Sequence, residues 1–275
     1  MARRKTGTRT KEDDGSRPAL LKGVRRALQL LEYLARHPGR ATDAAEGLGL
    51  PWATLHRTLS ELEQGGFLQR DPDSNRYSIG PRLWYIGTGY LANHPVLEAA
   101  QPYLEIAAES VEFTVQLVER LGDLSVTLYS QHRTGEAITK ATYGHHFPLH
   151  CGSKGQVLLA YAEPRFVESY LARDLERLTP ETITEPEVLR ARLDEIRAKG
   201  FARTEGDVQA FTGSLSAPIF NRKGEAVAAV CYIARRSALR HAAREEEVLE
   251  SLLGTAQSIS IALGWRPGDT LGREA

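Results

Sequence analysis

The chain has 275 residues, of which 41% are hydrophobic and 25% charged, and its formal net charge at pH 7 is zero. This length suits two domains with cores of their own, and the composition is that of ordinary globular proteins. Two cysteines exclude a disulfide framework and favour a reducing compartment, and the longest apolar run, AVAAVCYIA at 226–234, is too short to cross a bilayer, which takes roughly 20 residues.

The first residues are charged, which predicts a protein without a secretory signal, located in the cytoplasm and without a membrane partner. Residues 1–17 also lack apolar periodicity, so we expect a disordered basic arm there. Lys and Arg outnumber Asp and Glu by 15 to 10 in residues 1–82, whereas the ratio is 20 to 25 in residues 83–275. A basic first third on a neutral chain indicates contact with a polyanion.

Residues 18–82 carry the pattern of three helices followed by a β-hairpin. A first helix is predicted from Leu20 to the HPGR sequence at 37–40, because Pro and Gly both end helices. Its apolar positions at helical spacing are Leu21, Val24, Leu28, Leu31 and Leu34. A short second helix over 42–49 has Thr42 as its expected N-cap and Gly49 as its stop.

The third helix begins at Pro51, a favoured first helical residue, and ends at Gly65. Two short extended runs then surround the turn-forming sequence DPDSN at 71–75, which predicts a hairpin. Three helices and a hairpin in this order are the layout of a winged helix-turn-helix domain.

If Leu55, Leu59 and Leu62 face the core, the opposite face of the third helix carries polar groups and few acids, which suits a recognition helix in a DNA major groove. An ordinary amphipathic helix is the alternative, but the basic hairpin behind it favours double-stranded DNA as the partner. The predicted DNA contacts are Trp52, Thr54, His56, Arg57 and Ser60 of the helix, with Arg70 and Arg76 of the hairpin.

Residues 83–95 are predicted to form a linker helix that Pro95 ends. Residues 96–266 then mix helices and strands, which indicates an α+β domain with an antiparallel sheet, followed by a tail at 267–275. The predicted helices are 96–110, 154–172, 186–199 and 244–263, and the predicted strands are 112–120, 124–132, 215–221 and 225–234.

The chain resembles the IclR family of bacterial transcriptional regulators from about residue 20 to residue 265. The proline-led helix with Thr54 and Arg57 is similar to the DNA-binding domain of that family, as are Gly66-Phe67 and the Tyr-Ser-Ile-Gly sequence at 77–80. The sequences GQVLLA at 155–160 and GFARTEGDVQAFTGSLSAPIFNRKGEAVAA at 200–229 resemble its C-terminal domain. Three residues depart from the family pattern: Gln156 stands for Lys, Asp207 for Glu and Phe211 for Gly.

The resemblance implies a GAF-like α/β domain that binds a small effector and forms dimers or tetramers.

The stretch YGHHFPLHCGSKGQVLLA at 143–160 gathers three of the eight histidines and one of the two cysteines. An extended chain would place His146 and His150 roughly 13 Å apart, whereas zinc needs its ligand nitrogens about 3–3.5 Å apart. His150 and Cys151 would point in opposite directions, which disfavours a nucleophile–base pair.

Ser153 and Gln156 have the spacing of a capping box, which predicts a helix start there, and exposed N–H groups at a helix start attract anions. With Lys154 close by, this helix start is expected to form one wall of a pocket that favours carboxylates; a simple cap with surface histidines is the alternative. The expected effector-binding residues are His150, Cys151, Ser153 and Lys154, and the resemblance adds Ser214, Ser216, Cys231, Ile233 and Asp207, with the aromatic residues Tyr129 and Tyr143.

The sequence thus predicts a sequence-specific DNA-binding regulator, a repressor, controlled by a small organic effector that is aromatic or a carboxylate. We expect no cofactor, no metal and no enzymatic activity. Two alternatives remain: an enzyme that uses Cys151, His150 and Asp207, and a regulator whose C-terminal domain only forms oligomers.

Overall fold

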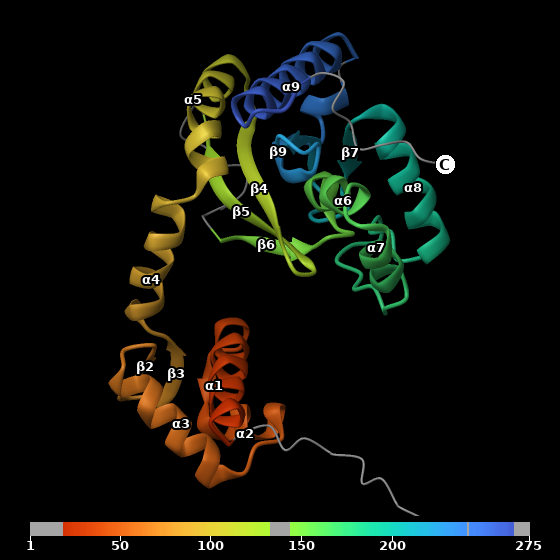
Figure 1. Ribbon diagram of the computed structural model, residues 1–275. Helices are drawn as coiled ribbons and strands as arrows, with labels where there is room; N and C mark the ends of the chain where they lie inside the picture. Colours follow the sequence, from red (N-terminus) through yellow and green to blue (C-terminus); the bar gives the residue numbers. More distant parts are fainter. Residues whose placement is uncertain (1–18, 133–143, 241, 267–275) are drawn as a thin grey trace, which may run out of the picture. The chain divides into compact units, whose positions relative to one another are not determined.

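The computed structural model describes residues 19–132, 144–240 and 242–266. The chain forms two compact units, residues 1–92 and residues 93–275 (Figure 1). The predicted basic arm at 1–17, the predicted tail at 267–275 and Tyr143 lie outside the described residues.

The first unit packs three helices against a small antiparallel sheet. The helices are α1 (Ala19–Arg36), α2 (Ala41–Leu48) and α3 (Trp52–Gln64). The sheet has the order β1-β3-β2, formed by Gly39–Arg40, Arg76–Ile79 and Leu68–Arg70. The core contains Leu30, Leu34, Ala44, Leu55, Leu59, Leu68 and Tyr77. The predicted winged helix-turn-helix architecture is therefore confirmed.

The predicted apolar face of the first helix is partly wrong. Val24 and Leu28 are 53% and 55% exposed, whereas Leu30 and Leu34 are buried in the core. Several apolar residues of α1 recur at helical spacing on more than one face, so periodicity alone did not identify the face that packs.

The N-cap of α2 is Arg40 rather than Thr42. Gly39 and Arg40 form β1, which pairs with β3, so the helix begins directly after the strand. The Asp43 carboxylate then accepts a hydrogen bond from the Arg40 backbone N–H at 2.9 Å. Gly49 ends the helix as predicted, in the left-handed conformation with φ 61°.

The predicted linker helix over 83–95 has different bounds in the structure. Helix α4 spans Pro81–Ala92, and Pro95 begins the next helix, α5 (Pro95–Ser110), instead of ending the linker. Pro81 and Pro95 each stand at the first position of a helix, where the backbone N–H that proline lacks is not needed for a helical hydrogen bond.

The second unit is built on a six-stranded antiparallel sheet with the order β6-β5-β4-β9-β8-β7. The strands are β4 (Thr114–Leu121), β5 (Leu124–Gln131), β6 (His146–Pro148), β7 (Ala202–Glu205), β8 (Thr212–Phe220) and β9 (Ala226–Arg235). The helices are α5, α6 (Gly152–Ala160), α7 (Pro164–Leu171), α8 (Pro186–Lys199) and α9 (Ala242–Ala262), with a short 3-10 turn at Ala238–Arg240. The α+β class is confirmed.

Helices cover both faces of this sheet. Cys231 and Tyr232 are neighbours on β9, so their side chains point to opposite faces. The Tyr232 hydroxyl lies 3.0 Å from Thr255 Oγ1 of α9, whereas Cys231 Sγ lies 4.0 Å from Ser153 Oγ of α6. Helices α5 and α9 pack together on one face, and α6 with α8 covers the other (Figure 1).

Two details of the second unit differ from the prediction. The helix expected over 154–172 is two helices, α6 and α7, separated just before Pro164. Strand β7 was not predicted, although it pairs with β8 through Ala202↔Ser216 and Glu205↔Gly213. Its four residues are too few to show a clear alternation. Among the described residues, no helix has both the length and the hydropathy of a membrane span.

Helix α6 lies very close to the chain that leads into it, and we expect Gly155→Ala to destabilise the second unit. A Cβ on Gly155 would lie 2.5 Å from the Leu149 carbonyl oxygen, so the backbone would have to move. The free energy of unfolding, measured in urea, should fall by about 1–3 kcal/mol.

Gly254→Ala in α9 is the matched control, because nothing lies within 4 Å of a Cβ there. It should raise the free energy of unfolding by about 0.5–1 kcal/mol through helix propensity. Equal effects of the two substitutions would contradict the tight packing of α6.

Candidate functional site

Helix α3 presents a polar face away from the core of the first unit. Leu55 and Leu59 are buried, whereas Trp52 is 53% exposed and His56 and Arg57 are exposed beside it. The rings of Trp52 and His56 lie 6.0 Å apart. The face therefore offers an indole, an imidazole and a guanidinium together, which are groups that can contact base edges and phosphates.

Thr54 and Ser60 lie at the edges of this face and are half-buried. The Thr54 backbone carbonyl accepts a hydrogen bond from Thr58 Oγ1 at 2.9 Å. Ser60 Oγ accepts a hydrogen bond from Gln64 Nε2 at 3.1 Å. None of the five predicted helix residues is buried, so each has surface in contact with solvent.

The wing is the hairpin of β2 and β3, and its two arginine side chains make contacts within the first unit. The Arg70 guanidinium donates to Asn75 Oδ1 and lies 5.8 Å from the Tyr77 ring centre, and the Arg76 guanidinium donates to the Pro38 carbonyl. Both side chains remain exposed. At the tip, the backbone N–H groups of Asp73 and Ser74 donate hydrogen bonds to the Asp71 carboxylate. The hydrogen bond from Ser74 is the largest cause of the lowered pKa of the Asp71 carboxyl.

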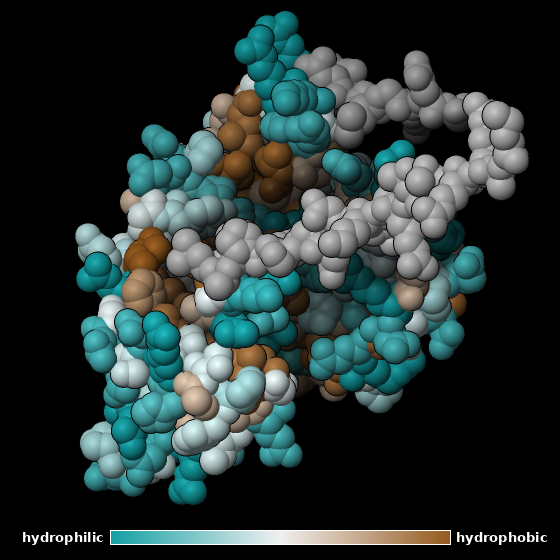
Figure 2. Space-filling model, turned by 60° about the horizontal axis from the view of Figure 1, so that its bottom comes forward, coloured by the Kyte–Doolittle hydropathy of each residue, from teal (hydrophilic) through white to brown (hydrophobic). Residues whose placement is uncertain are grey.

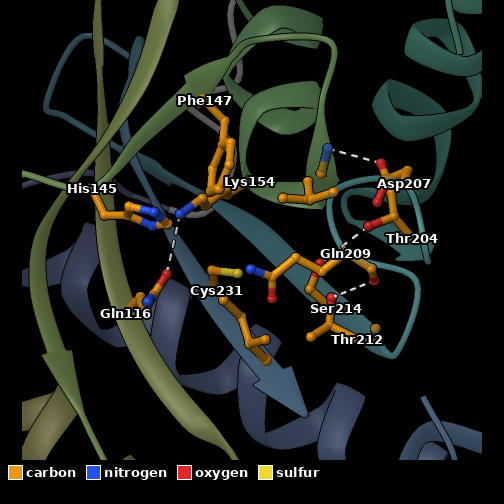
Figure 3. Close-up of a pocket in the computed structure, with 14 residues that line it drawn as sticks. Gln116, His145, Phe147, Lys154, Thr204, Asp207, Gln209, Thr212, Ser214 and Cys231 are labelled. Carbon is orange, nitrogen blue, oxygen red and sulfur yellow. Dashed lines mark hydrogen bonds between the residues drawn. The ribbon is translucent and has the colours of Figure 1, made fainter. Parts of the chain in front are cut away.

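The second unit contains a cavity between the start of α6, the sheet and the loop that joins β7 to β8 (Figure 3). Its volume is about 480 Å³, including its open mouth. Both polar and apolar residues line it: Gln116, His145, Phe147, Gly152, Lys154, Thr204, Asp207, Val208, Gln209, Thr212, Gly213, Ser214, Cys231 and Ile233. Five of the predicted residues, Lys154, Asp207, Ser214, Cys231 and Ile233, are among them.

Lys154 is the main charge of this cavity, although it is only 5% exposed. Its Nζ donates to Thr127 Oγ1 at 3.1 Å and to Gln116 Oε1 at 3.3 Å, and it lies 5.4 Å from the Phe147 ring centre. Among the described residues, no carboxylate forms an ion pair with it. Burial lowers the pKa of Lys154, because removing an ammonium from water disfavours its charged form.

The other ionisable groups of the cavity do not neutralise Lys154. Asp207 is directed to the backbone, where its carboxylate accepts a hydrogen bond from the Gly152 N–H at 2.8 Å, and burial raises the pKa of this carboxyl. Burial lowers the pKa of His145, and the Lys154 charge lowers it further. A buried cation without a matching anion is the kind of site that an organic acid can complete.

The predicted capping box at the start of α6 is wrong. The N-cap is Cys151, without a side-chain hydrogen bond to the helix, and the helix begins at Gly152. Ser153 Oγ instead hydrogen-bonds to Ser214 Oγ and Ser216 Oγ, both at 2.7 Å. Gln156 Nε2 donates to the His150 carbonyl at 3.1 Å. Both side chains serve the packing of α6 on the sheet, since every residue of α6 is buried.

His150 and Cys151 lie in the core and are not among the residues that line the cavity. His150 Nδ1 lies 2.8 Å from the Tyr170 hydroxyl, and Nε2 lies 2.8 Å from the Glu176 carbonyl. Both ring nitrogens are therefore in use, and neither is bonded to the thiol. Burial raises the pKa of Cys151 to about 12, which keeps the thiol protonated and unreactive at neutral pH. This geometry does not support a Cys–His nucleophile.

The remaining predicted residues also lie off the cavity wall. Ser153 and Ser216 are buried behind it, and Tyr129 is directed along β5 to Gln131. Sequence reasoning missed His145 and Phe147 of the β6 region, Gln116 of β4, and Gln209 and Thr212 near the start of β8. None of these has a motif, and only the pairing of the strands brings them together. The described residues contain no cluster of three or more His, Cys, Asp or Glu side chains that could hold a metal ion.

Residues 88–261 match the family described as Bacterial transcriptional regulator IclR C-terminal, and residues 23–72 match the IclR helix-turn-helix domain. The DNA-binding transcriptional repressor YiaJ of Escherichia coli (strain K12) is 29% identical over 262 residues, covering 93% of each chain. The HTH-type transcriptional repressor AllR of Klebsiella pneumoniae is 30% identical over 260 residues, covering 91% of this chain and 94% of that protein.

Solved structures agree with these relatives. An IclR transcriptional regulator from Alicyclobacillus acidocaldarius has a TM-score of 0.75 at 28% identity, covering 88% of this chain and 99% of its own. An IclR homologue from Microbacterium hydrocarbonoxydans, crystallised with 4-hydroxybenzoate, has a TM-score of 0.69 at 27% identity, covering 88% of this chain and 99% of its own.

Because Lys154 is a desolvated cation, we expect Lys154→Met to raise the free energy of unfolding at pH 7. The folded pKa lies below the ordinary 10.5, so the unfolded chain binds more protons between the two values. Stability of the wild type should therefore rise with pH across that window. The advantage of the variant, measured by urea unfolding from pH 7 to 10, should shrink as the pH approaches 10.5.

Lys199→Met is the matched control, because the Lys199 side chain is 55% exposed and paired with Glu195 on the surface of α8. Its effect should be small and should vary little with pH. A pH-independent difference for Lys154→Met would show that burial does not disfavour this ammonium.

Proposed function

This chain belongs to the IclR family of bacterial transcriptional regulators, and on that premise we propose that it is a repressor whose DNA binding is controlled by an organic acid held at Lys154. The observation that carries the proposal is the buried Lys154 ammonium without a carboxylate partner among the described residues. The proposed DNA contacts belong to the first compact unit of the chain, and the proposed acid-binding contacts belong to the second.

The exposed face of α3 is proposed to read the operator in the major groove. Arg57, His56 and Thr54 are the candidates for base or phosphate contacts, with Trp52 and Ser60 beside them. Arg70 and Arg76 of the wing would contact phosphates, which position the domain without reading sequence. Relatives named as repressors, YiaJ and AllR, support repression as the mode of action.

The cavity of the second unit is proposed to hold the effector with its carboxylate at Lys154. Phe147, Ile233 and Cys231 supply apolar surface next to that charge, which suits an aromatic ring. The Microbacterium homologue crystallised with 4-hydroxybenzoate supports an aromatic acid. Ser214 and Asp207 complete the set of proposed contacts.

Strand β9 offers a route from the cavity toward the DNA-binding unit. Cys231 lines the cavity, whereas the adjacent Tyr232 hydrogen-bonds to α9 on the opposite face. Helix α9 packs on α5, and α5 begins three residues after α4 ends. An acid that binds one arrangement of these elements more tightly would shift the population toward that arrangement.

A homodimer or a larger assembly is proposed as the active form. Helix-turn-helix proteins usually bind paired half-sites as dimers. Helix α4 has no buried residue, and Trp84, Tyr85, Ile86 and Tyr90 are each at least half exposed. Apolar side chains also form separate patches among hydrophilic ones on the face shown in Figure 2. Exposed apolar surface of this kind commonly marks a protein interface.

Catalysis is the less supported function for this chain. The buried, protonated Cys151 and the fully engaged His150 lack the arrangement of a nucleophile and its base. The relatives named above are all regulators.

The wild-type chain should bind DNA flanking its own gene more tightly than a scrambled duplex, and Arg57→Ala should remove most of that preference. One lost base contact costs about 1–3 kcal/mol, or roughly 5- to 150-fold in affinity. Fluorescence anisotropy over a salt series measures both affinities. Arg190→Ala, in an exposed ion pair of α8, is the control and should bind as the wild type does. Equal affinity for both duplexes would contradict sequence-specific binding.

The same assay tests the effector. Benzoate and its derivatives should change the affinity of the wild type for the flanking DNA, and Lys154→Met should retain DNA binding while losing that response. If no organic acid changes DNA affinity or thermal stability, the second unit serves only in assembly.

Charges on α4 should weaken the assembly. Ile86 and Tyr90 lie four residues apart and share one face of the helix. Light scattering after gel filtration should give a dimer or larger species for the wild type and a smaller species for the double variant Ile86→Glu, Tyr90→Glu. Val188→Glu, at an exposed apolar residue of α8, is the control. A monomeric wild type would contradict the proposed assembly.

A further inference from the structure

Gln209 places an amide in the cavity whose oxygen has no partner. Its Oε1 atom is buried and makes no hydrogen bond with any described residue. Gln209 lines the cavity, and its side chain extends toward Cys231 in the view of Figure 3. Buried polar atoms are normally satisfied, so an orphaned one in a ligand cavity indicates a group that the ligand supplies.

The backbone of Gln209 is held by hydrogen bonds, while its side-chain oxygen is unpaired. Its carbonyl accepts hydrogen bonds from the Thr212 N–H and the Thr212 hydroxyl, both at 3.0 Å. Upstream, the Gly206 and Asp207 carbonyls each accept a hydrogen bond at 2.7 Å, from the hydroxyls of Thr179 and Thr182. The loop therefore directs the amide into the cavity from a held position.

The nearby polar groups of the protein are already engaged. The Thr212 hydroxyl donates to the Gln209 backbone, and Ser214 Oγ lies 2.7 Å from Ser153 Oγ and 3.1 Å from Thr204 Oγ1. Lys154 comes from a different wall, α6, and donates to Gln116 and Thr127. The cavity thus presents a cation from α6 and an unsatisfied amide oxygen from the loop before β8, and Cys231 and Ile233 of β9 also line it.

We propose that Gln209 is a specificity-determining residue that recognises a hydroxyl group on the body of the acid held at Lys154. A hydroxyl both donates and accepts, so it satisfies either orientation of the amide. The proposed ligand class is therefore a hydroxylated aromatic monocarboxylic acid. This inference rests on the proposed function, because it takes the Lys154 carboxylate site as given.

The test compares four probes on the full-length chain by calorimetry: benzoate, 4-methylbenzoate, 3-hydroxybenzoate and 4-hydroxybenzoate. Methyl and hydroxyl groups are close in size, so the methyl acid controls for shape. At least one hydroxy acid should bind wild type about three- to tenfold more tightly than the methyl acid, the range expected for one net hydrogen bond.

Gln209→Met keeps the length of the side chain and removes its polar atoms. In this variant the preference for the hydroxyl should disappear, and the methyl acid should bind at least as tightly as it binds wild type, because no buried amide is left unpaired. A purely structural role would weaken all four acids together. Gln257→Met, at an exposed position of α9, should leave every affinity unchanged.

The outcomes separate the two proposals. Equal binding of the hydroxy and methyl acids by wild type, or an unchanged preference in Gln209→Met, overturns the role of Gln209 and leaves the Lys154 site intact. If none of the four acids binds wild type, the organic-acid site itself fails and the hydroxyl assignment fails with it. If Lys154→Met loses binding of the acids, and Gln209→Met keeps binding but loses the preference for the hydroxyl, both proposals are supported.

Discussion

Helix α6 is buried along its whole length, and this burial determines the chemistry of the second unit. A helix without a solvent face must satisfy its polar side chains inside the protein. Ser153 does so on β8, and Gln156 does so on the chain before the helix. Among the described residues, the contacts of the Lys154 ammonium are neutral oxygens and an aromatic ring, so none of them compensates its charge. The cavity of the second unit lies next to that charge, because Lys154 is one of the residues that line it.

The DNA-binding unit could be predicted from sequence because its signals are local. Pro51 and Gly65 bound the third helix, Leu55 and Leu59 define its buried side, and the turn residues at 71–75 define the wing. The prediction failed where local signals were ambiguous. Leu28 of α1 fits helical spacing as well as Leu34 does, but only the second contacts the core.

The cavity could be predicted only in part, because its walls come from segments far apart in the sequence. Lys154 was found through its position near a helix start, and Ser214 and Cys231 through resemblance to a family. His150 was misplaced because a histidine next to a cysteine has the same sequence signature whether it faces a ligand or, as here, hydrogen-bonds to Tyr170 in the core. Gln209 has no local signal at all: its importance depends on what its amide fails to contact.

The loop that carries Gln209 separates the support of the fold from the choice of ligand. Threonine side chains hold its backbone, while the Gln209 Oε1 atom makes no hydrogen bond to the described protein. Replacement of that one side chain should therefore cost the protein little stability, so natural selection is free to vary it. A change of ligand then requires one substitution at this position and no change in the side chains that hold the loop.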